Sequence, residues 1–232
     1  MDWAIFSQLG SEFLFRWVHF LAGITWIGVL YYFNFIQGEW FKEISADVKG
    51  TAIKTLVPRA LWWFRWGAMF TFLSGAAILL MRAHSGTWDV FNSSWGVMIG
   101  VGAFLGTLMF LNVWLIIWPN QKIVIRSAQE VSEGREPLPQ AAAALAKAGL
   151  ASRTNTLFSI PMLFFMGAAA HLPMMMSDST FWSAITPAAI VIAAIEINAI
   201  FGRLGPLASV KGVIHSGIFL TIILYALLEQ FA

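Results

Sequence analysis

The 232-residue chain contains no cysteine. This absence excludes disulfides, iron–sulfur clusters, thiolate zinc sites and haem attached through a Cys-x-x-Cys-His motif. Any metal must be held by histidine, methionine, carboxylate or backbone groups. Charged residues are also scarce, at 11% of the chain, whereas a soluble domain has about 25%. The few lysines and arginines are spread thinly over the loops, so the formal charge of +2 gives no support to nucleic-acid binding.

Long apolar stretches take up most of the chain, which is 59% hydrophobic. Six stretches are near the length of about 20 residues that a helix needs to cross a bilayer: 17–38, 60–81, 90–121, 154–177, 182–201 and 212–228. Tryptophans flank them, as in the aromatic belts of membrane interfaces: Trp3, Trp40, Trp62, Trp88, Trp95, Trp118 and Trp182. We therefore expect an all-α integral membrane protein, a bundle of about six transmembrane helices that forms one domain over residues 1–232 in the lipid bilayer.

The loop charges predict the orientation, because lysine and arginine accumulate on the cytoplasmic side. The loops 39–59, 122–153 and 202–211 carry most of these residues, whereas the alternate loops hold only Arg82. Both termini are therefore expected on the periplasmic face of a bacterial inner membrane.

Two further features concern the ends of the spans. Residues 1–12 lack the basic region and cleavage site of a signal peptide, so the first helix is expected to be retained. Residues 38–54 and 140–150, in the inside loops, are expected to form short amphipathic segments along the membrane surface.

Ionisable residues inside spans are costly, so each one is a functional candidate. His19 and His171 lie at similar depths near the outer boundary, on different predicted helices. A bis-histidine haem b needs two imidazoles that approach the iron from opposite faces. Arg16 lies on the His19 face and would meet a haem propionate, and His84 in the outer loop is a reserve ligand. The alternative is that each histidine is held by a backbone carbonyl or a hydroxyl group, since the spacing does not show that the helices are neighbours.

A second polar layer is predicted near the inner boundary, from Arg65, Asn112, Glu196 and His215. A carboxylate in apolar surroundings takes up a proton or pairs with a cation, so Glu196 is expected to pair with Arg65 or His215. This layer is either a proton or anion site that faces the cytoplasm, or a structural ion pair between helices.

Four segments carry a family resemblance: HFLAGITWIGVLYYFNFIQ (19–37), RALWWFRWGAMFTFLSG (59–75), NVWLIIWPNQK (112–122) and ASRTNTLFSIPMLFFMGAAAH (151–171). Together they resemble the N-terminal membrane domain of bacterial membrane-bound urate oxidase (urate hydroxylase). The first helix, with His19, Trp26 and Gly28, is more distantly similar to that of membrane protoporphyrinogen oxidases, where a histidine in that place is thought to bind haem. The resemblance thus implies haem ligation by His19.

Urate oxidases of this family carry a C-terminal cytochrome c domain, which follows the membrane domain on the outer face. The chain stops at Ala232 without a cysteine, so an oxidoreductase of this kind would need a separate electron acceptor. We expect a haem-binding redox membrane protein that passes electrons from a small reductant, urate by resemblance, to an external cytochrome or quinone. One alternative is a non-enzymatic accessory subunit of a larger respiratory or photosynthetic membrane complex. Another is a small transporter that uses Glu196 and His215 for proton coupling.

Overall fold

The computed structural model describes residues 3–86, 88–176 and 181–231. Over these ranges the chain is helical and has no strand, as predicted. The long helices are α1 (Gln8–Tyr31), α4 (Val57–Gly86), α5 (Ser94–Leu111), α6 (Trp118–Ser132), α7 (Ala141–His171), α8 (Phe181–Phe201) and α9 (Val210–Phe231). The short elements are η1 (Ala4–Phe6), η2 (Tyr32–Gln37), α2 (Gly38–Glu43), α3 (Ala46–Thr55), η3 (Trp88–Asn92), η4 (Asn112–Ile117) and η5 (Gly205–Ala208).

Five helical stretches are long and apolar enough to cross a bilayer: Gln8–Glu43, Val57–Ser85, Ser94–Ser132, Phe181–Phe201 and Val210–Phe231. They correspond to five of the six predicted spans. The predicted fourth span falls in α7, which has 31 residues but is less apolar than the others. Its polar side chains are turned inward, because Thr154, Asn155, Thr156 and Ser159 are all fully buried.

Helix α7 also corrects the prediction for residues 140–150. This Ala-rich segment is not a separate surface helix, because α7 begins at Ala141 and continues to His171 without a break. Alanine is the best helix former and no proline lies between the segment and the span, so the helix simply extends. The other inside segment, 38–54, does form two short helices, α2 and α3. Ser177, the predicted end of the span, lies outside the described residues.

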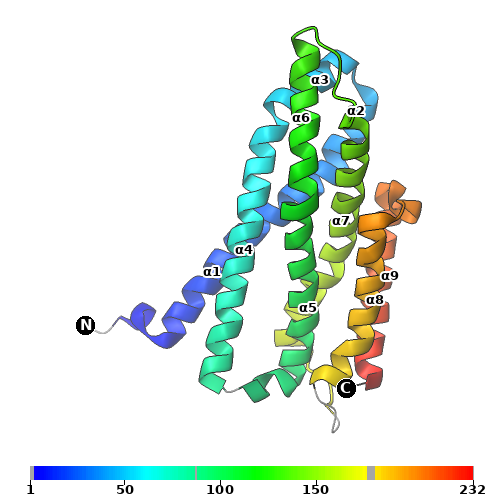
Figure 1. Cartoon of the computed structure of the whole chain (residues 1–232). Coiled ribbons are helices and arrows are strands. Elements are labelled where there is room, and N and C mark those ends of the chain that lie inside the picture. The colour runs from blue at the N-terminus through cyan, green and yellow to red at the C-terminus, as the bar shows by residue number, and fades with distance from the viewer. Residues whose placement is uncertain (1–2, 87, 177–180, 232) are drawn as a thin grey trace.

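The bundle is arranged around α7, which packs against α1, α5, α6, α8 and α9. Figure 1 shows α4, the rod of α5 and α6, and the pair α8 and α9 as successive upright columns, with α7 between them. The core contains Trp26, Phe64, Leu105, Phe158 and Phe165, each at most 1% exposed. Near the top of Figure 1, α2, α3, α6 and the first turns of α7 extend past α8 and α9.

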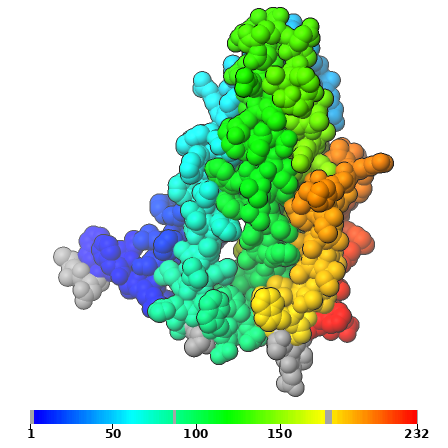
Figure 2. Space-filling model, viewed as in Figure 1, coloured from blue at the N-terminus to red at the C-terminus, as the bar shows by residue number. Residues whose placement is uncertain are grey.

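Helix α1 is strongly tilted. Its N-terminal half leans away from the bundle in Figure 1, and in Figure 2 the first residues project from the body of the molecule. Its main neighbour is α4, and near its inner end Tyr31 contacts Ser159 of α7. Its outer half therefore exposes large apolar side chains, among them Phe13, Trp17, Phe20 and Ile24.

Two π-helical turns interrupt the long rods. Tyr32–Gln37 joins α1 to α2, and Asn112–Ile117 joins α5 to α6. A π turn inserts a residue into the α-helical hydrogen-bond pattern and turns the following side chains to a new direction. Each of these turns contains a buried asparagine, Asn34 and Asn112, whose side chain reaches α7.

Candidate functional site

The imidazole of His19 is fixed by the backbone of α4. Its Nδ1 atom lies 2.8 Å from the carbonyl oxygen of Thr71 and 3.3 Å from Ser74 Oγ. A carbonyl oxygen only accepts hydrogen bonds, so Nδ1 carries the proton in the neutral ring and Nε2 keeps its lone pair. Gly75 allows this close approach, because a Cβ there would lie 3.0 Å from His19 Cε1 and the ring would have to shift.

An ionic cluster lies toward the outer end of the same pair of helices. Glu12 Oε1 accepts a hydrogen bond from Arg82 Nε at 2.9 Å and pairs with the guanidinium of Arg16 as well. The carboxylate is largely buried, with 12% of the side chain exposed. One anion and two cations leave a formal charge of +1. The sequence prediction named Arg16 alone, whereas the structure adds Glu12 and Arg82 to it.

The other two outer histidines are not joined to His19. His171 is the last residue of α7 and His84 lies in the last turn of α4, and both are exposed. Within residues 3–86, 88–176 and 181–231, no hydrogen bond links either ring to His19. His19 lies on α1 and His171 on α7, and the hydrogen bond that joins these two helices is made by Tyr31, at the inner end of α1.

Four elements meet in a buried amide network at the inner layer. Asn112 Nδ2 donates to Asn155 Oδ1 at 2.9 Å and to Glu196 Oε2 at 3.1 Å. Asn155 Nδ2 in turn donates to the carbonyl oxygen of Met109 at 2.9 Å. Asn112 and Asn155 are 1% and 0% exposed, so the network ties α5, η4, α7 and α8 together in the core.

The partner predicted for Glu196 is wrong. Its hydrogen-bond donor is Asn112, not Arg65 or His215. Arg65 instead places its guanidinium carbon 3.5 Å from the ring centre of Trp118 and 5.6 Å from that of Trp114. His215 is exposed on α9. The sequence placed Glu196, Arg65 and His215 at similar depths in the membrane. Depth along a helix axis, however, does not determine which way a side chain points.

A second set of polar contacts joins α1 and η2 to α7 and was not predicted. Tyr31 Oη lies 2.9 Å from Ser159 Oγ, and Asn34 Nδ2 donates to Ser152 Oγ at 2.9 Å. The signal in the sequence is the spacing of polar residues on α7, at 152, 155, 156 and 159. Residues three and four apart share a helix face, so this spacing indicates a polar stripe within an apolar helix.

Comparison with known proteins adds the family. A family model described as urate oxidase N-terminal matches residues 77–228, which is more than half of the chain. The matched region includes His84, Asn112, His171, Glu196 and His215, whereas Arg16, His19 and Arg65 precede it. No curated protein and no solved structure matches the chain.

Proposed function

The chain belongs to the urate oxidase N-terminal family, and we propose that it is a membrane electron-transfer domain that carries a b-type haem with His19 as an axial ligand. Electrons would come from a small reductant, urate by family, and pass to an external cytochrome or a quinone. The observation that carries this proposal is the hydrogen bond between His19 Nδ1 and the carbonyl oxygen of Thr71.

This hydrogen bond suits a ligand histidine. Histidines that bind metals usually donate their other ring N–H to a carbonyl or carboxylate, which fixes the tautomer and the ring orientation. Thr71 meets this requirement and leaves Nε2 of His19 as the ligating atom. Gly75 contributes by letting the ring lie directly against α4.

The second axial ligand is assigned to His171, with His84 in reserve. Both rings are exposed and lack a hydrogen-bond partner within the part of the chain that the structure describes. They are therefore free to ligate, but neither is held in place as His19 is. His19 is thus the ligand that best fits the group, and the proposal depends on it alone.

The cluster of Glu12, Arg16 and Arg82 fits a carboxylate substituent. Two guanidiniums share the single carboxylate of Glu12, so the cluster keeps a charge of +1 that suits a further anion, and haem carries two propionates. On α1, Glu12 lies about two helical turns before His19, or about 10 Å along the axis, and Arg16 lies less than one turn before it. Cations near a redox group also favour its reduced form, because reduction adds negative charge.

When bound, the haem would supply the one-electron chemistry, while the protein supplies ligation, burial and charge. The chain's own residues hold the ligand ring, through Thr71, Ser74 and Gly75, and hold the helices around it. In this proposal the hydrogen-bond network of Asn112, Asn155 and Glu196 has a structural role, because it connects α8 to α7.

The alternative of an accessory subunit is favoured by one feature. The outer half of α1 exposes Phe13, Trp17 and Phe20, at 62%, 54% and 68%, on a helix that leans away from the bundle (Figure 1). Such a surface suits lipid, or the helices of a larger membrane complex, equally well.

A visible absorption spectrum of the purified protein tests the proposal. The wild type is expected to show a Soret band and, after reduction, an α band. His19→Ala should lose both while the protein stays folded in the membrane, as checked by circular dichroism and gel filtration. His215→Ala is the matched control and should keep the full spectrum. A wild-type protein without haem, or His19→Ala with an unchanged spectrum, would favour the accessory-subunit alternative.

A further inference from the structure

A groove on the inner part of the bundle carries excess positive charge. It encloses about 410 Å³ between the start of α4, the end of α3 and the length of α6. Its charged lining consists of Lys54, Lys122, Arg126, Arg135, Glu130 and Glu133. Four cations and two anions give the groove a formal charge of +2. In Figure 1, α4 and α6 lie side by side at this level.

The carboxylates of the groove are already paired. Glu130 accepts a hydrogen bond from Arg135 and lies 3.7 Å from Arg126, and Glu133 pairs with Arg135. The hydrogen bonds that Arg135 donates to Glu130 and Glu133 raise the pKa of its guanidinium. Lys54 and Lys122 have no carboxylate partner among the described residues, so they carry the excess charge.

An indole holds Lys122 of the groove and one further cation, Arg65, close together at the bilayer end of the groove. Trp118 has the guanidinium carbon of Arg65 at 3.5 Å from its ring centre and Lys122 Nζ at 5.6 Å. Each contact is a cation–π interaction. Neither cation is neutralised by a carboxylate within residues 3–86, 88–176 and 181–231. Two cations on one ring repel each other, and an anion beside them would remove that repulsion.

The groove lies at the level expected for lipid headgroups. Pro58, which lines it, is one helical turn, about 6 Å along the axis, before Trp62 on α4. Trp62, Trp63 and Trp66 are 48%, 59% and 37% exposed, as tryptophans of an interfacial belt are. Basic pockets between transmembrane helices at this level are suited to anionic lipid headgroups.

We propose that the groove of Lys54, Trp118, Lys122 and Arg126 binds the phosphate of an anionic phospholipid headgroup. The two lysines supply the charge, Arg126 lines the groove beside them, and the indole of Trp118 keeps Lys122 in position. This site is separate from His19, and it does not depend on haem binding.

Native mass spectrometry of the full-length protein in detergent tests the site, with phosphatidylglycerol, phosphatidylcholine and inorganic phosphate as separate additions. Each lysine near a phosphate contributes about fivefold in affinity, so Lys54→Gln with Lys122→Gln should bind phosphatidylglycerol about 25-fold more weakly than wild type. The double variant Lys54→Arg with Lys122→Arg should retain binding, because it retains both charges.

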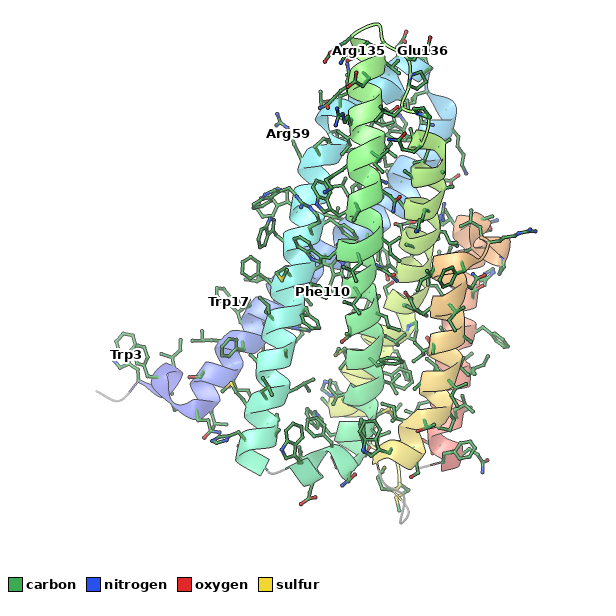
Figure 3. All side chains as sticks on the ribbon, in the orientation of Figure 1. Trp3, Trp17, Arg59, Phe110, Arg135 and Glu136 are labelled. Atoms are coloured by element: carbon green, nitrogen blue, oxygen red, sulfur yellow. The ribbon has the colours of Figure 1, made fainter. Side chains whose placement is uncertain are left out.

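Arg59→Gln is the matched control. Arg59 is an exposed cation of α4 that points away from α6 in Figure 3 and does not line the groove. It should leave phosphatidylglycerol binding unchanged. Equal binding of phosphatidylcholine and phosphatidylglycerol, or no loss in the glutamine double variant, overturns the proposal. If inorganic phosphate alone binds with the same dependence on the two lysines, the ligand is free phosphate and the lipid assignment is overturned.

Discussion

Nδ1 of His19 donates to the carbonyl oxygen of Thr71 across the α1–α4 contact, at 2.8 Å. This bond connects α1, which exposes many large apolar side chains, to the long helix α4, and Gly75 beside it allows the close approach. The close approach of α1 to α4 continues at Gly67, where a Cβ would lie 3.0 Å from the backbone nitrogen of Trp26. Small residues on α4 thus determine how α1 docks, as in membrane helix pairs generally.

Gly75→Val should destabilise the α1–α4 contact. The new side chain would push against the His19 ring, and overpacking of this kind costs about 1–3 kcal/mol. Chemical unfolding in detergent, followed by circular dichroism, measures the change. Gly28→Val is the control, since nothing lies within 4 Å of a Cβ at Gly28. Equal midpoints for the two variants would mean that the histidine has room to move.

Asn112→Ala should weaken the attachment of α8 to α7. It leaves the buried Oδ1 atom of Asn155 without its donor, and an unsatisfied buried group costs about 1–3 kcal/mol. The half-buried carboxylate of Glu196 loses its donor as well. Chemical unfolding in detergent, followed by circular dichroism, measures the loss of stability. Ile197→Ala is the comparison, because Ile197 is 60% exposed and neighbours Glu196 in sequence. A larger loss of stability in Ile197→Ala than in Asn112→Ala would show that packing, not the amide network, holds α8 in place.

Tyr31→Phe should cost about 0.5–1.5 kcal/mol, the net worth of one hydrogen bond, because it removes the contact with Ser159 Oγ. Tyr32→Phe provides the reference, since no hydrogen bond of the Tyr32 hydroxyl is present within the described part of the chain. A thermal-shift assay on the two purified variants separates them. Identical melting temperatures would argue against a role of this bond in joining α1 to α7.

Single cysteines should report the orientation, because the chain has none of its own. Met175, 90% exposed after α7, and Glu136, in the turn before α7, lie at opposite ends of that helix. In intact cells an impermeant thiol reagent is expected to label Met175→Cys and not Glu136→Cys. Labelling of Glu136→Cys alone would invert the predicted topology.

The composition and the apolar runs were sufficient to predict the fold class. Water cannot solvate a chain that is 59% hydrophobic, and backbone groups in lipid must bond internally, so helices are the outcome whatever their arrangement. The same patterns placed the five apolar spans, because span length follows from bilayer thickness. The start of α7 was missed because it lies in an Ala-rich segment that carries Lys147 and lacks the bulky apolar residues of a span, but has high helix propensity.

For the site residues, too, the sequence predicted some contacts and missed others. Sequence depth alone grouped Asn112 with Glu196, and the structure joins them by a hydrogen bond. Depth also grouped Arg65 with Glu196, but Arg65 stacks on Trp118, because the rotation of α4 about its axis directs it to α6. The sequence by itself determined which residues lie in a membrane helix and roughly how deep. Only the tertiary structure decided which helix faces meet. The reason is that these faces depend on packing between segments far apart in the chain. This packing determines the rotation of each helix, the π turns at Asn34 and Asn112, and the close contact at Gly75.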